Sequence, residues 1–125
     1  YRFSSLKRCV ILGAKLKLSP AKKDFIANLM REYLSRRLSS QNTRFANAGC
    51  IFKNPPDNSA GKLIDLCGLK GAAVGKAEVC ARHANFILNR GNAKCADVLK
   101  LMRVIQKKVK TKFKINLQPE IKIWR

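Results

Sequence analysis

The chain has 125 residues, enough for one domain with a modest core, and it carries a formal net charge of +20. No apolar run approaches the roughly 20 residues of a membrane-spanning helix, and no signal segment opens the sequence. The charge attracts polyanions such as nucleic acid, anionic lipid or phosphorylated small molecules. Because the lysines and arginines are spread over every segment, they favour a solvated surface over a dedicated groove.

The cysteines are odd in number and irregularly spaced, without a CxxC pair or a Cys/His cluster. They are Cys9, Cys50, Cys67, Cys80 and Cys95. This pattern argues against a zinc site, so we expect no bound metal. Reduced thiols in a cytosolic protein fit it best.

The first part of the chain predicts a strand followed by a helix. Apolar and polar residues alternate over residues 10–18, which is typical of a strand with one buried face. Ser19 is a good N-cap and Pro20 suits the first helical position. An apolar stripe at helical spacing then runs over residues 25–34, and we expect the helix to end near Arg36 and Arg37.

The stretch over residues 48–55 combines a turn former, a reactive side chain and a short apolar run. Gly49 and Cys50 precede Ile51 and Phe52, and two prolines stop the run. The order predicts a strand that presents a thiol at its start and a loop carrying Lys53 and Asn54 at its end. An ordinary buried strand with a buried cysteine is the alternative that this pattern leaves open.

The middle of the chain predicts short elements joined by glycines. Ser59 can cap a helix over residues 60–67, and Gly68 is placed to end it. An irregular connection over residues 71–75 leads to two short strands, at residues 77–80 and 85–89. Gly91 and the following asparagine signal a turn.

The longest helix is predicted over residues 96–113. Its apolar residues keep spacings of three and four; they are Val98, Leu101, Met102, Ile105, Val109 and Phe113. The lysines on its outer face read as a solvated surface. After a break, a last strand is expected over residues 121–124. Glu120 precedes it and follows a proline, a place where a carboxylate can be held rigidly, although such a residue is often only surface.

These elements predict an α+β fold, a small α/β sandwich of short strands with helices packed on one face. Neither a GxGxxG sequence nor a Walker loop is present, so the chain offers no phosphate cradle of those kinds.

Three stretches together resemble the C-terminal part of the UDP-N-acetylenolpyruvoylglucosamine reductase family. They read AGCIFKNPP, SAGKLIDLCGLKG and AEVCARHANFILNRGNAKCADVLKLMRVIQKKVKTKFKINLQPEIKI. The resemblance covers nearly the whole chain in order and spacing. It implies that residues 1–18 are the tail of a FAD-binding domain and that residues 19–125 are the substrate-binding domain. We therefore expect a fragment whose partner is the missing N-terminal FAD-binding domain.

The family uses NADPH and FAD to reduce an enolpyruvyl ether on a UDP-sugar in peptidoglycan precursor synthesis, in the cytoplasm. The resemblance therefore implies a UDP-sugar substrate, with FAD and NADPH in the intact enzyme. We expect this chain alone to hold no cofactor and to be inactive, with no membrane or nucleic-acid partner.

The resemblance also assigns roles to individual residues. Arg2 and Glu120 match the positions that stabilise the reaction intermediate, where fixed charge and hydrogen bonds are needed. Cys50 stands where the family usually has a serine proton donor, and a thiol is the stronger acid of the two. Lys53 and Asn54 match residues that face the substrate.

Further matches lie at the flavin side of the motif. Tyr1 and Ser4 match there; we assign Tyr1 to substrate binding and Ser4, with Gly49, to cofactor binding. Lys76 departs from the family by replacing a small residue, which puts local packing or substrate contact in doubt. His83 is kept, and we interpret it as structural. The short connections look like the family's shorter subtype.

Two other hypotheses remain open. A basic nucleic-acid-binding module would explain the charge, but it would not explain the Gly49-Cys50 or Pro119-Glu120 sequences. The few aromatic residues are not arranged as a stacking platform for bases. A degenerate fragment with only a packing role is the other possibility.

Overall fold

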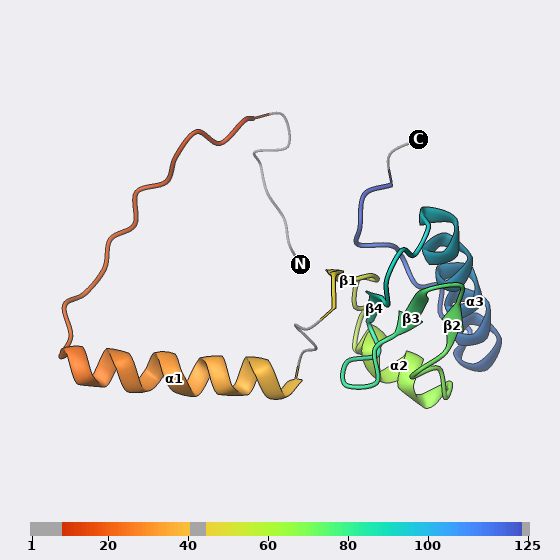
Figure 1. The fold of residues 1–125 in the computed structure, drawn as a ribbon, viewed down its shortest axis with the longest axis horizontal. Helices are drawn as coiled ribbons and strands as arrows, with labels where there is room; N and C mark the ends of the chain where they lie inside the picture. The colour runs from red at the N-terminus through yellow and green to blue at the C-terminus, as the bar shows by residue number, and fades with distance from the viewer. Residues whose placement is uncertain (1–8, 41–44, 124–125) are drawn as a thin grey trace.

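The computed structural model describes residues 9–40 and 45–123. The helices in this part are α1 (Lys23–Ser40), α2 (Ala60–Leu66) and α3 (Cys95–Phe113). The strands are β1 (Asn47–Cys50), β2 (Ala73–Val74), β3 (Ala77–Val79) and β4 (Phe86–Asn89). They form one antiparallel sheet in the order β1-β4-β3-β2 (Figure 1). The predicted α+β class is therefore confirmed.

One face of the sheet forms the main core with α2 and α3. Val79 of β3 lies opposite Ile87 of β4, and both are buried in a cluster that includes Ile64 of α2 and Ile105 of α3. Side chains on this face alternate with those on the other because successive strand residues point to opposite sides. The expectation that helices pack on one face of the sheet is therefore confirmed for α2 and α3.

The opposite face carries a smaller apolar cluster covered by an arginine. Phe86 and Leu88 of β4 are buried there, with Phe45 packed against them. The guanidinium carbon of Arg90 lies 4.2 Å from the centroid of the Phe45 ring, and Arg90 Nε lies 3.1 Å from a carboxylate oxygen of Glu78. This face is therefore covered by side chains, and neither α2 nor α3 packs on it.

Helix α3 matches its predicted range to within one residue. Leu101, Met102, Ile105 and Val109 are its buried residues, at the spacings that place them on one side. The Asp97 carboxylate accepts a hydrogen bond from the Lys94 backbone N–H at 3.0 Å, so the first turn is capped from within.

Helix α2 also begins and ends where the sequence indicates. Ser59 is the N-cap, and its side chain accepts from the Lys62 backbone N–H at 3.5 Å. Gly68 follows the C-cap with φ +68°, a left-handed conformation that glycine adopts without steric cost. Leu63 and Ile64 are buried.

The sequence reading missed β2. The residues expected to form an irregular connection include a two-residue strand that pairs with β3 through a hairpin. Gly75, in the turn, has φ +57°, and Val74 lies opposite Ala77. Two-residue hairpin loops favour glycine at such positions, and that was the available signal.

The predicted strand over residues 10–18 is wrong. Residues 9–22 are neither helix nor strand, and their side chains are exposed; Leu12 is 95% exposed. Alternation describes only which side chains share a face, whereas a strand also needs a hydrogen-bonded neighbour, and none of the described strands pairs with this segment. The helix that follows begins at Lys23, so Ser19 and Pro20 are not its cap and first residue.

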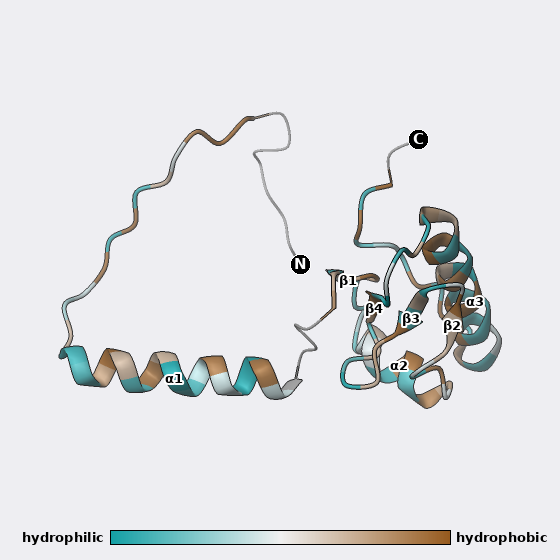
Figure 2. Ribbon diagram, viewed as in Figure 1, coloured by the Kyte–Doolittle hydropathy of each residue, from teal (hydrophilic) through white to brown (hydrophobic). Residues whose placement is uncertain are grey.

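Helix α1 carries the predicted apolar stripe but does not bury it. Phe25, Met30 and Leu34 are 61%, 67% and 56% exposed. The helix lies apart from the sheet and from α3 in Figure 1, and Figure 2 shows apolar residues recurring along it. No described helix has the length and apolar character needed to cross a membrane. The stripe is therefore an exposed apolar face.

The strand expected over residues 121–124 is also wrong over residues 121–123, and residue 124 lies outside the described part. The C-terminal segment instead makes one isolated antiparallel bridge, between Pro119 and Phe52. Proline has no N–H to donate to a ladder, which restricts pairing at this point. Ile121 still packs against the main core, so its apolar character serves burial without regular pairing.

The first prediction tests the two faces of α3. Ile105→Ala should lower the free energy of unfolding by about 2–5 kcal/mol because it leaves a cavity in the core. Lys107→Ala, on the exposed side of the same helix, is the matched control and should change it by no more than about 0.5 kcal/mol. Equal shifts of the denaturant midpoint in the two variants would contradict this assignment of faces.

The second prediction concerns Gly75. A Cβ built there would lie 2.6 Å from the Asp97 carboxylate, which cannot easily yield because it caps α3. With the positive φ as well, Gly75→Ala should destabilise the fold by about 1–3 kcal/mol. Gly61→Ala is the control. Gly61 lies in helix α2, and a Cβ there would meet its nearest atoms at 3.6 Å or more. A thermal midpoint of Gly75→Ala at or above that of Gly61→Ala would refute the clash.

Candidate functional site

The segment around Cys50 begins with an irregular end to β1. Gly49 has φ +76° and its backbone N–H donates to the Asn47 side-chain oxygen at 3.0 Å. The pairing with β4 shifts register between Asn47 and Cys50. Cys50 is therefore the last residue of a strand, and the expectation that a strand starts at this thiol is wrong. The bulge and the left-handed glycine bend the chain just before the thiol.

Backbone pairing joins this segment to the one that carries Glu120. Phe52 bridges Pro119, the Lys53 N–H donates to the Gln118 carbonyl at 2.9 Å, and the Glu120 N–H donates to the Ile51 carbonyl at 2.8 Å. Residues far apart in the sequence are thus held side by side through main-chain groups. Glu120 lies opposite the residue that follows Cys50.

The environments of the two candidate catalytic side chains differ. Cys50 is half-buried and packs against the smaller apolar cluster of Cys80, Phe86 and Leu88. Glu120 is half-buried at the other segment of the bridge. The backbone pairing brings the two segments together, and that both side chains open onto one cleft stays a prediction.

A cavity of about 300 Å³ lies beside the bridge. It is lined by Lys53, Asn54, Pro55, Pro56, Asn116 and Gln118. An ammonium group and three amide side chains supply donors and acceptors suited to phosphate, carbonyl and hydroxyl groups. The two predicted substrate-side residues, Lys53 and Asn54, are therefore placed together at an open cavity.

Asn54 also shapes the cavity wall. Its side-chain oxygen accepts from the Ala60 backbone N–H at 3.0 Å, which ties the proline loop to the start of α2. The sequence reading missed Asn116 and Gln118. The only available signal was their place shortly before Glu120, because their approach to Lys53 depends on the bridge.

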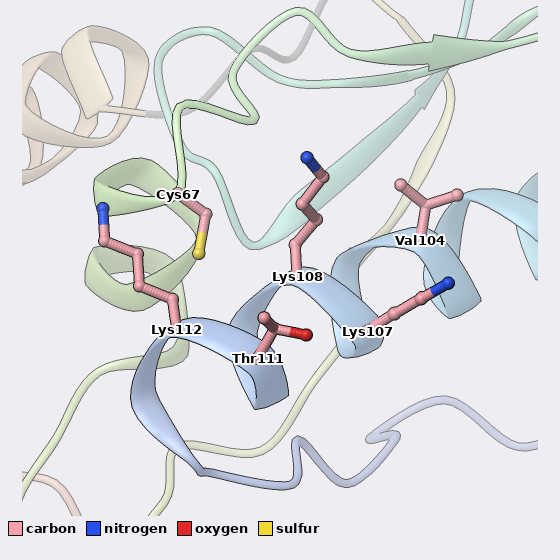
Figure 3. A pocket seen from close by; sticks show the side chains of 6 residues that line it. All are labelled: Cys67, Val104, Lys107, Lys108, Thr111 and Lys112. Atoms are coloured by element: carbon pink, nitrogen blue, oxygen red, sulfur yellow. The ribbon is translucent and has the colours of Figure 1, made fainter.

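A larger hollow of about 550 Å³ lies elsewhere, against the C-terminal half of α3 (Figure 3). Its lining residues are Cys67, Val104, Lys107, Lys108, Thr111 and Lys112. The Lys112 ammonium donates to the Leu66 carbonyl at 2.6 Å, and Lys107 and Lys108 point apart (Figure 3). These lysines belong to the exposed face of an amphipathic helix, and no predicted site residue lies among them.

Two further residues singled out in the sequence have identifiable positions. The His83 ring packs edge-on against Phe86, with centroids 4.5 Å apart. Lys76 is exposed in the hairpin turn between β2 and β3, where its carbonyl accepts from the Arg90 N–H at 2.9 Å. The Lys76 side chain therefore takes no space in the core.

The remaining predicted residues fall outside the part that the structure describes. They are Tyr1, Arg2 and Ser4. Within residues 9–40 and 45–123, no group of three or more His, Cys, Asp or Glu side chains could hold a metal ion. The five cysteines are free thiols.

Comparison with known proteins matches this chain to one family. The family model for "UDP-N-acetylenolpyruvoylglucosamine reductase, C-terminal domain" covers residues 41–124. A curated relative with the enzyme's name from Fervidobacterium nodosum is 43% identical over 98% of this chain, and another from Caldanaerobacter subterraneus is 45% identical over 98%. The chain spans only 40% and 41% of these relatives' lengths.

A solved structure agrees with the sequence relatives. The crystal structure of UDP-N-acetylenolpyruvylglucosamine reductase from Thermus caldophilus matches 89% of this chain and 39% of its own, with 40% identity and a TM-score of 0.71. Sequence and fold thus agree over most of the described residues. The chain belongs to the UDP-N-acetylenolpyruvoylglucosamine reductase family, and residues 41–124 are its C-terminal domain.

Proposed function

We propose that this chain is the substrate-binding part of a cytoplasmic flavin-dependent reductase of peptidoglycan precursor synthesis. The reaction is reduction of the enolpyruvyl group of UDP-N-acetylglucosamine enolpyruvate to UDP-N-acetylmuramate with NADPH. The observation that carries the proposal is the bridge between the segments of Cys50 and Glu120, beside the cavity of Lys53 and Asn54. Family membership supplies the reaction class, and the bridge supplies a site suited to it.

The cofactor of this proposal is FAD, which when bound supplies hydride, drawn from NADPH, to the vinyl carbon. Among the described residues, Gly49 fits a place beside such a group. A Cβ built there meets nothing within 4 Å, so its backbone faces open space that a large planar ligand could approach. We assign Ser4 to the same side.

The chain's own residues then stabilise the negative charge of the intermediate and supply the proton. Reduction of the vinyl group leaves negative charge on the neighbouring carbon and its carboxylate, which calls for fixed positive charge and hydrogen bonds. Arg2 suits the carboxylate through its fork of donors. Cys50 donates the proton to carbon, and Glu120 shares a proton or orients the substrate. Lys53 and Asn54, with Tyr1, bind the UDP-sugar.

The partner in the proposal is the rest of the enzyme. The curated relatives are longer proteins of which this chain matches about two fifths. Helix α1 exposes a row of apolar residues, including Phe25, Met30 and Leu34. Exposing such a face to water is unfavourable in free energy, and burying it against another domain would be favourable. We assign it, with residues 1–18, to contact with the N-terminal FAD-binding domain.

A nucleic-acid-binding module is the second candidate, favoured by the net charge of +20. The lysines of α3 belong to an exposed basic face, but they offer only screened, non-directional attraction to a polyanion. The bridge and its cavity have no part in this candidate. Binding measurements separate the two.

The third prediction is that UDP-N-acetylglucosamine binds at the cavity beside the bridge. In a titration followed by NMR, the backbone amides of Lys53, Asn54 and Gln118 should shift. Lys53→Ala should weaken binding by about tenfold, since it removes one charge-assisted hydrogen bond. The matched control, Lys107→Ala, removes the same charge from α3 and should leave the dissociation constant unchanged.

The opposite pattern would support the second candidate. No shift with the UDP-sugar, together with duplex DNA binding that falls steeply with salt, would overturn the substrate assignment. Equal weakening of UDP-sugar binding by both lysine changes would show that only general charge attracts the ligand.

The fourth prediction concerns the proton donor and uses the full-length enzyme. Cys50→Ala should slow flavin reoxidation by the enolpyruvyl substrate by about 100-fold or more, the usual contribution of a general acid. Flavin reduction by NADPH should stay nearly the same. Cys50→Ser should retain more activity than Cys50→Ala, because a hydroxyl can still donate. Stopped-flow absorbance resolves the two half-reactions, and unchanged reoxidation in Cys50→Ala would remove Cys50 from the mechanism.

A further inference from the structure

Asn85 is a buried polar residue of the main fold, only 2% exposed. It directly precedes β4 and is hydrogen-bonded to the segment that follows Cys50 through both its side chain and its main chain. Its side-chain oxygen accepts from the Phe52 N–H at 3.0 Å, and its side-chain nitrogen donates to the Phe52 carbonyl at 2.8 Å. Its main-chain carbonyl accepts from the Ile51 N–H at 2.8 Å.

The reason for these contacts lies in the bridge between Phe52 and Pro119. The hydrogen bonds of that bridge are made by the flanking residues, Lys53 with Gln118 and Glu120 with Ile51. The N–H and C=O of Phe52 therefore point away from Pro119. They would be buried without partners if the Asn85 amide did not meet both of them.

An asparagine amide has a donor and an acceptor side by side, as the N–H and C=O of one strand residue are toward its neighbour in an antiparallel pair. The Asn85 side chain thus takes the place of one more residue of β4 and continues the pairing of β1 with β4 beyond the Cys50–Phe86 pair. Phe52 is held on one side by Asn85 and on the other by the segment of Glu120. One buried side-chain amide therefore fixes the two peptide groups on either side of Phe52, the residue that bridges to the segment of Glu120.

We propose that Asn85 is a positioning residue of the active site. It sets the spacing between the Cys50 thiol, on one side of Phe52, and Lys53 and Asn54 on the other, and it steadies the Glu120 segment across the bridge. This inference rests on the proposed reductase function. Asn85 touches no reacting atom in this role; it acts through the backbone of Phe52.

The test uses the full-length enzyme and two variants. Asn85→Asp keeps the shape but, when ionised, presents only acceptors to the Phe52 carbonyl. Asn85→Ser keeps a single small polar group, so it weakens the two hydrogen bonds to Phe52 without introducing a buried charge. Val109→Ala is the control, since it shortens a buried side chain of α3 and removes none of the hydrogen bonds of Asn85 or of the bridge. All are measured at a temperature where circular dichroism shows each to be folded.

We expect flavin reoxidation by the enolpyruvyl substrate to slow by about tenfold to a hundredfold in both Asn85 variants, because small misplacements of reacting groups have effects of this size. The rate of flavin reduction by NADPH should stay within about twofold of wild type, a much smaller change than the slowing of reoxidation. Val109→Ala should lower the thermal midpoint yet leave both half-reactions unchanged. A purely structural role for Asn85 would make its variants behave like Val109→Ala.

Hydrogen exchange on the present chain gives a second measurement that needs no turnover. The Phe52 amide should exchange faster in Asn85→Ser than in wild type or Val109→Ala, whose bridges are intact. Unchanged exchange at Phe52, or normal reoxidation in both Asn85 variants, would overturn the positioning role. Failure of the wild-type enzyme to be reoxidised by the enolpyruvyl substrate would instead overturn the proposed function itself.

Discussion

The antiparallel bridge between Phe52 and Pro119 is the contact on which the arrangement of the candidate site depends. It is short, and its two flanking hydrogen bonds would not hold the segments alone. Burial supports it: Phe52 and Leu117 are only 1% and 3% exposed and anchor the two segments in the main core. Hydrophobic packing provides the stability, and the hydrogen bonds provide the alignment. The sheet and two helices serve the site mainly by holding these anchors.

The helices of the core could be predicted from the sequence because their signals are local. The spacing of Leu101, Ile105 and Val109 defines a buried face within one segment, and Ser59 marks the start of α2 by its own side chain. The strands were harder. Residues 10–18 alternate as a strand should, yet pairing depends on a neighbour that the pattern does not contain. The prediction that the helices pack on the sheet is wrong for α1 for the same reason, since the spacing of apolar residues does not say what covers them.

The candidate site could be predicted only in part. Lys53 and Asn54 stand within one motif, so their shared position at a cavity follows from local sequence. Asn116, Gln118 and Asn85 approach that motif only through the bridge and β4, and nothing in the spacing of the chain announces such contacts. Buried asparagine is uncommon in a core. Its position as the first residue of a predicted strand was a usable signal, but the sequence did not indicate that its side chain would pair with Phe52.

The Asp97 carboxylate, which caps α3 and abuts Gly75, makes a helix start and a hairpin turn depend on each other. Both features use one side chain, so opening the hairpin exposes the cap, and fraying the helix removes the wall behind the turn. We therefore expect the β2–β3 hairpin and the first turn of α3 to open together in local unfolding, since each is too short to be stable by itself. A carboxylate shared between two elements would then add to the cooperativity that the apolar core provides.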